Sequence, residues 1–175
     1  MKKLGEMLLF FIILTFLLTS SVRAQSGYVL PYPSSMPGSS VYKVHLVWEK
    51  IMEFWYFGSL AQFEYNLKQS DKYLVESKTL FEYKQYLLGF KALEKSNHYF
   101  KQSVPRLEMA KSEGKNVELK EDLFQQAAKK HIEEIEKILA NTPEVFVWSP
   151  EKEDPSTLEI HKLIKKSINI RKNAL

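Results

Sequence analysis

The chain has no cysteine among its 175 residues. It therefore forms no disulfide and offers neither a thiolate metal ligand nor a cysteine nucleophile, so packing alone must hold the fold together. It also lacks a large charge of one sign. The net charge is +4, and residues 1–24 hold three basic residues and one acidic residue, which leaves about +2 for the remainder. Because a dedicated nucleic-acid binder shows a concentrated basic face, we expect no nucleic-acid partner.

The motifs of common catalytic sites are missing as well. The sequence has no glycine-rich phosphate loop, no G-x-S-x-G elbow and no H-E-x-x-H pair. No repeat of 20 to 50 residues recurs three times, which argues against a solenoid. We therefore expect no cofactor and no enzymatic activity. An enzyme or metal-binding protein with an unrecognised site is kept as a third hypothesis.

The N-terminus has the pattern of a secretory signal peptide. Lys2 and Lys3 precede an apolar run from Met7 to Leu18, and Val22-Arg23-Ala24 supplies a cleavage site. We predict a signal peptide over residues 1–24, cleaved near Ala24, and hence a secreted or cell-envelope location. The alternative is an uncleaved membrane anchor, because the apolar stretch approaches the ~20 residues that span a bilayer.

The next segment, residues 25–41, is rich in proline. Pro31, Pro33 and Pro37 restrict the backbone to extended conformations, and Ser39 or Ser40 can cap a helix that follows. The segment is therefore expected to lead from the export signal into the first helix. Its apolar residues are too many for an idle linker, and we expect them to pack on the helices: Tyr28, Leu30, Tyr32 and Met36.

Helical periodicity dominates the rest of the chain and predicts an all-α protein of four to five helices. We divide it into a helical bundle over 42–140, an extended arm over 141–155 and a basic amphipathic C-terminal helix within 156–175. The expected helices cover about 42–57, 59–81, 86–107, 117–140 and 156–172. The second and third, joined by a short connection, should form an antiparallel hairpin.

Three local features refine this prediction. Gly89 lies inside the third helix, where its small size would let another helix approach closely, and Pro105 should kink or locally end that helix. In the arm, Val145, Phe146 and Trp148 are expected to lie on the bundle.

The first helix has one strongly apolar stripe, with lysine and glutamate opposite. The end of this helix, "FWYF" at 54–57, is apolar nearly all round, so it is either covered by other helices or part of a recognition surface. The stripe comprises Val44, Val47, Trp48, Ile51, Phe54 and Trp55.

About half of the chain, residues 28–105, resembles an uncharacterised family of exported bacterial helical proteins, a domain of unknown function. Members carry a Tyr-x-Leu-Pro-Tyr-Pro-Gly motif, which here reads "YVLPYPS", with Ser34 in place of the glycine. Matching positions are Tyr28, Leu30, Pro31, Tyr32, Pro33, Pro37, Tyr42, Asp71, Lys72, Leu74 and Glu76. The resemblance implies an exported helical domain and implies no reaction.

Few residues are candidates for a site. His131 and Glu134 share a helix face and form half of a bundle metal site, but "KKHIEEIEK" is also typical of a solvated charged face. We therefore expect no metal site there. His45, His98 and His161 lack spaced partners and are interpreted as ordinary helix residues.

Two surfaces remain as candidates for binding. Exposed aromatic rings can stack on glycan or peptide, although aromatics at helical spacing mostly form core. The candidate aromatic residues for such a surface are Tyr65, Tyr73, Tyr83, Tyr86, Tyr99 and Trp148. The basic C-terminal helix can either lie on anionic lipid or pack as a terminal helix. Its basic residues are Lys162, Lys165, Lys166, Arg171 and Lys172.

From these observations we expect a non-enzymatic binding or scaffolding domain of the bacterial cell envelope, with an unidentified protein or envelope ligand as partner. The alternative is a membrane-surface protein, held by an uncleaved N-terminal helix and by the basic C-terminal helix on an anionic membrane.

Overall fold

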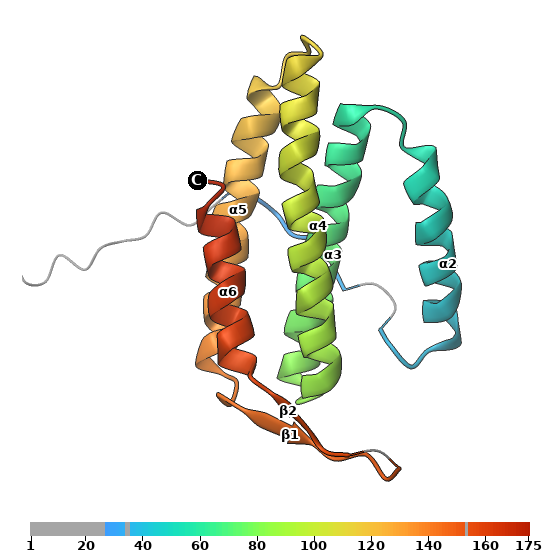
Figure 1. The fold of residues 1–175 in the computed structure, drawn as a ribbon, viewed down its shortest axis with the longest axis vertical. Coiled ribbons are helices and arrows are strands. Elements are labelled where there is room, and N and C mark those ends of the chain that lie inside the picture. Colours follow the sequence, from blue (N-terminus) through green and yellow to red (C-terminus); the bar gives the residue numbers. More distant parts are fainter. Residues whose placement is uncertain (1–26, 34–35, 153) are drawn as a thin grey trace, which may run out of the picture.

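The fold is given by a computed structural model, which describes residues 27–33, 36–152 and 154–175. The predicted signal peptide lies outside the described residues. The described chain holds five helices and one small hairpin of strands (Figure 1), so the prediction of an all-α fold is confirmed. The elements are α2 (Ser40–Trp55), α3 (Ser59–Glu82), α4 (Tyr86–Ser112), α5 (Glu118–Ala140), β1 (Phe146–Trp148), β2 (Ser156–Leu158) and α6 (Ile160–Lys172).

The predicted antiparallel hairpin of two long helices is α3 and α4. Residues 83–85 join them in a Schellman turn, in which the Gln85 amide donates to the Leu80 carbonyl at 2.8 Å and Lys84 takes a left-handed φ of 58°. The connection is too short for any other arrangement than neighbouring antiparallel helices. α4 then runs through Pro105 to Ser112, so the prediction that Pro105 ends the helix locally is wrong.

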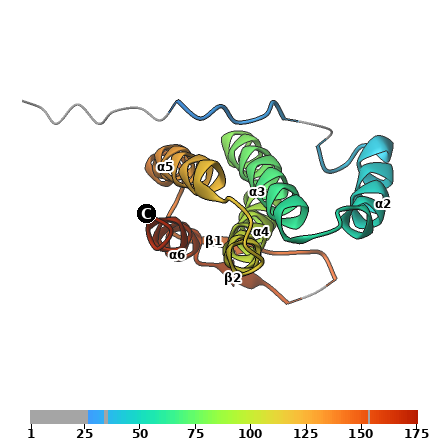
Figure 2. The ribbon, with the colours of Figure 1, turned by 90° about the horizontal axis from the view of Figure 1, so that it is seen from above.

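Four helices enclose the core, and α2 lies to one side of them. Figure 2 shows α3, α4, α5 and α6 grouped around a common centre, with α2 at the edge of the molecule beside α3. One half of the core contains the rings of Phe63, Phe100 and Phe124, with Phe100 stacked on Phe124 at 4.7 Å between ring centroids. The other half contains aliphatic side chains from the same helices, including Leu74, Leu93, Ile135 and Ile164.

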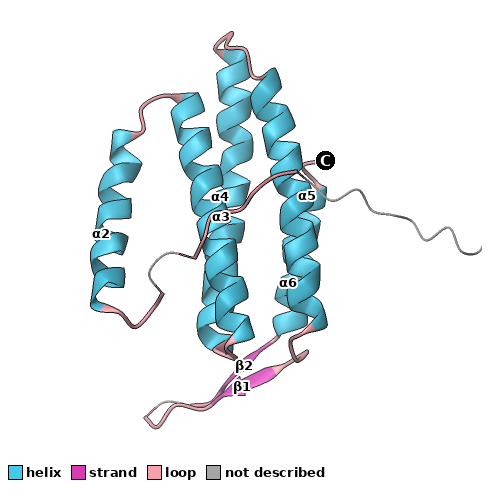
Figure 3. Cartoon of the chain, turned by 180° about the vertical axis from the view of Figure 1, so that it is seen from behind, coloured by secondary structure: helices cyan, strands magenta, loops and turns pink. Residues whose placement is uncertain are grey.

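The segment before the last helix differs from its prediction. Residues Phe146–Trp148 pair antiparallel with Ser156–Leu158, with Phe146 opposite Leu158 (Figure 3). Ser156–Leu158 is thus a strand and not the first turn of a helix, since pairing satisfies its backbone and α6 begins only at Ile160. Phe146 packs on Tyr86 with ring centroids 4.8 Å apart, and Trp148 is half-buried, whereas Val145 is exposed, contrary to expectation.

The N-terminal helix has the predicted cap. The Tyr42 amide donates to the Ser39 hydroxyl oxygen at 3.2 Å, and α2 ends at Trp55, three residues before Gly58. In the segment before it, Tyr28, Leu30 and Met36 are half-buried, as expected. Tyr32 is 96% exposed, so the expectation that it packs is wrong.

Among the described residues no helix combines the length and apolar character needed to cross a bilayer.

Gly89 has the predicted role of allowing close approach. The Ser77 hydroxyl on α3 donates to the Gly89 carbonyl at 2.9 Å, and a Cβ at position 89 would lie 3.1 Å from the ring of Phe81. Phe81 is buried in the core and has little room to move.

Replacing Gly89 with alanine should therefore lower the free energy of unfolding by about 1 kcal/mol, because the overpacking cost exceeds the gain in helix propensity. In a Phe81→Leu background the same replacement should become neutral or stabilising. Denaturant unfolding of the four chains of this double-mutant cycle measures both effects. Equal effects of Gly89→Ala in the two backgrounds would show that the contact with Phe81 is unimportant.

Candidate functional site

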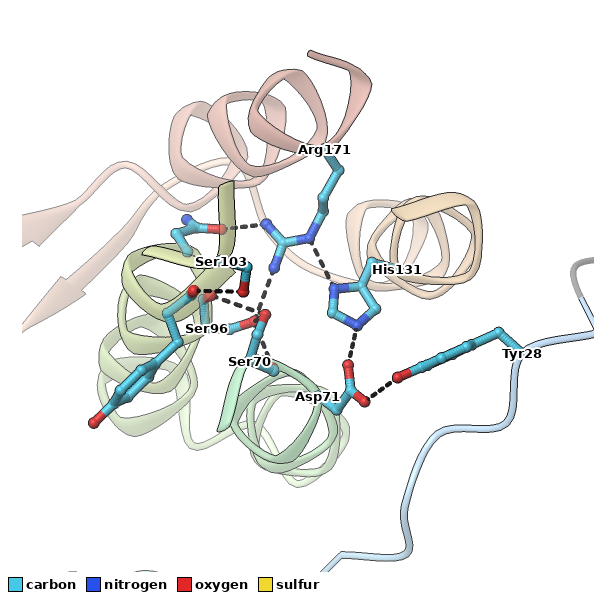
Figure 4. Close-up of polar contacts among 9 residues, drawn as sticks. Tyr28, Ser70, Asp71, Ser96, Ser103, His131 and Arg171 are labelled. Atoms are coloured by element: carbon cyan, nitrogen blue, oxygen red, sulfur yellow. Dashed lines mark hydrogen bonds and ion pairs between the residues drawn. The ribbon is translucent and has the colours of Figure 1, made fainter. Parts of the chain in front are cut away.

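The most distinctive group of side chains is a buried chain of three ionisable residues at the centre of the bundle (Figure 4). Asp71 on α3 contacts His131 on α5, with Oδ1 and Nε2 2.7 Å apart. Arg171 on α6 donates from Nε to Nδ1 of the same imidazole at 3.2 Å. His131 and Arg171 have no solvent-exposed surface, and Asp71 is also buried. We call these three residues the buried relay.

The hydrogen bonds determine the tautomer of His131. A guanidinium N–H can only donate, so Nδ1 of His131 must accept and carries no proton. Nε2 then bears the hydrogen and donates to the Asp71 carboxylate. A neutral imidazole therefore separates the cation of Arg171 from the anion of Asp71, and the relay as a whole is electrically neutral.

Three of the four remaining N–H groups of Arg171 also donate hydrogen bonds. Nη1 donates to the Asn97 side-chain oxygen and to the Ser167 carbonyl, the latter at 3.1 Å, and Nη2 donates to the Ser96 hydroxyl at 2.8 Å. The guanidinium carbon lies 4.9 Å from the ring centroid of Phe100, which adds a cation–π contact. A fully buried cation is tolerated only with this degree of satisfaction.

Small hydroxyl residues bring α3 and α4 together beside the relay. Ser96 donates to the Ser70 carbonyl at 2.8 Å, and Ser70 donates back to the Ser96 carbonyl at 3.0 Å. Both serines are completely buried. The pair lets the helix backbones approach closely and places Ser96 where Arg171 can reach it.

Burial and the neighbouring charges set the protonation states of the relay. Burial lowers the pKa of His131, and the positive charge of Arg171 lowers it further, while the contact with Asp71 opposes both. Burial lowers the pKa of Arg171 to about 9, and the charge of Asp71 opposes this, so Arg171 is a cation at neutral pH. His131 is thus neutral at neutral pH, as its hydrogen bonds require.

Tyr28 connects the relay to the N-terminal segment. Its hydroxyl donates to Asp71 Oδ2 at 2.5 Å (Figure 4), which occupies the second oxygen of that carboxylate. Burial and the negative charge of Asp71 raise the pKa of Tyr28, so it remains a protonated donor. Tyr28 and Asp71 are 43 residues apart in the sequence, and no local pattern indicates their contact.

The relay contains no free position for chemistry. Both nitrogens of His131 and both carboxylate oxygens of Asp71 have partners, and the serines nearby contact Arg171 or backbone instead of the imidazole. A nucleophile–base pair would need a hydroxyl against His131. The arrangement is suited to holding α3, α4, α5 and α6 together.

His131 and Glu134, which the sequence offered as half of a metal site, have different hydrogen-bond partners in the structure. Glu134 receives hydrogen bonds from Lys78 at 2.7 Å and Lys137 at 2.7 Å, and Lys130 lies 3.2 Å from it. Burial disfavours its charge, but these hydrogen bonds outweigh burial and lower the pKa of Glu134 to about 2. The interpretation of this stretch as a solvated face is wrong for both residues, which are buried because the face turns toward α3 and α6.

No group of three or more histidine, aspartate or glutamate side chains within residues 27–33, 36–152 and 154–175 is arranged to hold a metal ion. Of the other histidines, His45 and His98 are exposed, and His161 is half-buried, with Nε2 2.9 Å from the Thr142 carbonyl oxygen. These three stay apart from the relay.

The predicted aromatic surface is mostly interior. Tyr65 and Tyr73 are buried, and Tyr73 stacks on the half-buried Tyr99 with centroids 5.7 Å apart. They are core residues because they fill the space between the α3–α4 hairpin and α2. Tyr86 and Trp148 are half-buried near the strand hairpin. Tyr83 alone of the six is strongly exposed, at the turn between α3 and α4.

The C-terminal helix packs into the bundle. Its apolar residues Leu163, Ile164 and Ile168 are buried, which leaves no apolar face to enter a lipid surface. Of the two alternatives for this helix, the one in which its basic residues face lipid is wrong for Arg171, which is the buried cation of the relay. Lys162, Lys165, Lys166 and Lys172 are exposed on the opposite side.

Unlike α6, the helix α2 contacts the bundle through its polar side. α2 meets the bundle through Glu49, whose carboxylate accepts hydrogen bonds from Lys72 and from the Tyr73 hydroxyl, the latter at 2.9 Å. The Tyr65 hydroxyl donates to the Glu49 carbonyl at 3.0 Å, and Tyr42 donates to Glu76 at 2.9 Å. The attachment is therefore largely polar.

The apolar stripe of α2 points away from the bundle. At 100° per residue, Val44, Val47, Ile51, Phe54 and Trp55 lie about 140–240° around the helix axis from Glu49. Val47 is 61% exposed, Phe54 79% and Trp55 70%. We call these five residues together with Trp48 the α2 stripe. Of the two interpretations of the "FWYF" end at 54–57, full coverage by other helices is wrong, because Phe54, Trp55 and Phe57 are exposed.

Comparisons of the chain with protein-family models, with curated proteins and with solved structures gave no match. The relay and the α2 stripe are therefore interpreted from their own geometry.

Replacing Tyr28 with phenylalanine should release the N-terminal segment locally. The lost hydrogen bond to a charged acceptor is of a class that contributes about 1.5–3 kcal/mol. Proteolysis between residues 27 and 36 should accelerate by tenfold or more, while the four-helix core unfolds at nearly the same denaturant concentration. Tyr32→Phe, at an exposed ring, is the matched control and should change neither. Unaltered proteolysis of Tyr28→Phe would contradict this role.

His131 should make the protein less stable in acid. Because its folded pKa lies below the unfolded value near 6.5, the unfolded chain binds the extra proton, and stability falls as pH drops below about 6.5, by up to about 1.4 kcal/mol per pH unit. His131→Gln keeps one donor and one acceptor without titrating. Chemical denaturation between pH 7.5 and about 5 should show a smaller pH dependence for this variant. An identical pH dependence would mean that His131 is not the titrating group.

Proposed function

We propose that this protein is an exported, non-enzymatic binding or scaffolding protein of the bacterial cell envelope, and that it binds through the α2 stripe. The proposal rests on one observation above the others. An amphipathic helix is attached to a well-packed bundle by its polar side, and its apolar side is left in solvent. Exposed apolar patches of this kind are uncommon on monomeric proteins and mark interaction sites.

The buried relay supports the non-enzymatic part of the proposal. Its three ionisable residues are buried, and His131 is hydrogen-bonded to both of the others. A catalytic centre needs perturbed groups that a substrate can reach. Here the perturbed His131 has no exposed surface, which favours a structural role.

Export and the envelope location are supported by the sequence alone. The signal pattern of residues 1–24 and the resemblance of residues 28–105 to exported helical proteins point the same way. The alternative of a membrane-surface protein held by its C-terminal helix is less well supported, because the apolar face of α6 is buried. An uncleaved N-terminal helix stays compatible with the proposal.

In vivo photo-crosslinking tests the binding surface. A photoreactive phenylalanine analogue at Phe54 should give adducts in cells that export the full chain, because this side chain is the most exposed of the α2 stripe. The matched control places the same analogue at Tyr83, an aromatic residue with 74% exposure on the α3–α4 turn, where adducts should be at least tenfold weaker. Adducts of equal yield at both positions, or no adduct with either protein or lipid at Phe54, would contradict the proposal.

A further inference from the structure

The edges of the α2 stripe carry two different kinds of residue. Lys43 and Lys50 lie on one flank, about 100–120° from Glu49 around the helix, and both are exposed. Trp48 and Trp55 lie on the other flank, where they are 61% and 70% exposed. Between the flanks run Val44, Val47, Ile51 and Phe54, so a continuous apolar surface is bordered by cations and by indole rings.

We propose that the α2 stripe lies in the surface of a phospholipid bilayer, with the α2 axis parallel to the membrane plane. This inference rests on the proposed function and names the partner of the same surface. Tryptophan is enriched at the membrane–water interface, because its ring is apolar and its N–H remains hydrated. Lysine at the edge of an apolar face extends its ammonium toward lipid phosphates.

A second copy of the chain is a poorer occupant. Val44, Val47, Ile51 and Phe54 follow a coiled-coil spacing of three and four, but for only two heptads, where a stable coiled coil uses three or four. In such a dimer, the residues on the two flanks of one stripe would also have to contact the flanks of the other copy. Lys43 and Lys50 would meet either tryptophan or lysine of the other copy, and no acidic residue on the flanks complements them.

The placement of α2 permits contact with a flat surface. Figure 2 shows α2 at the edge of the described molecule, with no other helix on its outer side, and Phe57 just beyond its end is 81% exposed. Tyr32, also exposed, borders the same groove as Trp48. The aromatic surface therefore continues from the stripe onto the N-terminal segment.

The chain before α2 leads to the same surface. The apolar run Met7–Leu18 precedes Ser40 by 22 residues, a length that spans at most ~70 Å. If this run is retained in a bilayer, α2 is within reach of the same leaflet. If it is removed, the α2 stripe is the attachment to lipid.

Tryptophan fluorescence tests the inference with a readout confined to α2. The chain has three tryptophans, so a Trp148→Phe variant keeps only Trp48 and Trp55, both in the stripe. This variant, isolated from cells in its natural processed form, is mixed with vesicles of phosphatidylethanolamine and phosphatidylglycerol that carry bromine on the acyl chains. We expect a blue shift of the emission and quenching by the brominated lipid, because both rings enter the interface.

Charge substitutions supply the matched controls. Phe54→Asp in the same background should weaken the partition into vesicles by about tenfold or more and restore the emission. Leu119→Asp is the same kind of change at an exposed apolar residue of α5, and it should leave partition and quenching unchanged. Circular dichroism of both variants checks that the helices persist.

Emission that brominated vesicles neither shift nor quench would overturn the inference. So would a lipid-free dimer, seen by analytical ultracentrifugation, that Phe54→Asp dissociates, since a second copy would then cover the stripe. Protein adducts from Phe54 in cells without quenching would reject the bilayer as partner and leave the proposed function standing. Absence of both adducts and quenching would reject both.

Discussion

Arg171 is a cation with no exposed surface, and this burial constrains the rest of the fold. A buried guanidinium is stable only if its charge is balanced and its donors are paired. Those partners come from Asn97 and Ser96 on α4, from His131 on α5 and, through His131, from Asp71 on α3. All four helices of the bundle must therefore be in register at one level before the charge is satisfied. Misplaced helices would leave an uncompensated ion, at a cost of about 3–5 kcal/mol.

The same constraint limits what the centre of the protein can do. Both nitrogens of His131, both oxygens of Asp71 and four of the five N–H groups of Arg171 have hydrogen-bond partners inside the protein. Tyr28 closes the last position on Asp71 and in doing so fixes the N-terminal segment across the bundle. The buried ionisable residues thus connect the helices of the bundle, and on the described surface the α2 stripe is the most unusual feature.

Periodicity was sufficient to predict the helices, their approximate ends and the α3–α4 hairpin, because each helix has an apolar face at helical spacing. It could not predict the relay. Asp71, His131 and Arg171 are up to 100 residues apart in the sequence, and a lone charged residue on a helix normally faces water. Arg171 was therefore grouped with the lysines of a helix that could either face lipid or pack with its basic residues in solvent, and His131 beside Glu134 was interpreted as part of a solvated face. Likewise, strand pairing at Ser156–Leu158 depends on a partner ten residues away, which the local pattern does not reveal.

The α2 helix shows a different limit of pattern analysis. An apolar stripe predicts a buried surface but does not say which surface covers it. In this chain the answer depends on Glu49 and Tyr42, whose polar contacts with Lys72, Tyr73 and Glu76 determine how α2 is rotated on the bundle. With that side of the helix held, the stripe on the opposite side must face outward. Whatever covers it comes from beyond the described fold, and a helix edged by tryptophan and lysine has the composition expected for a lipid surface.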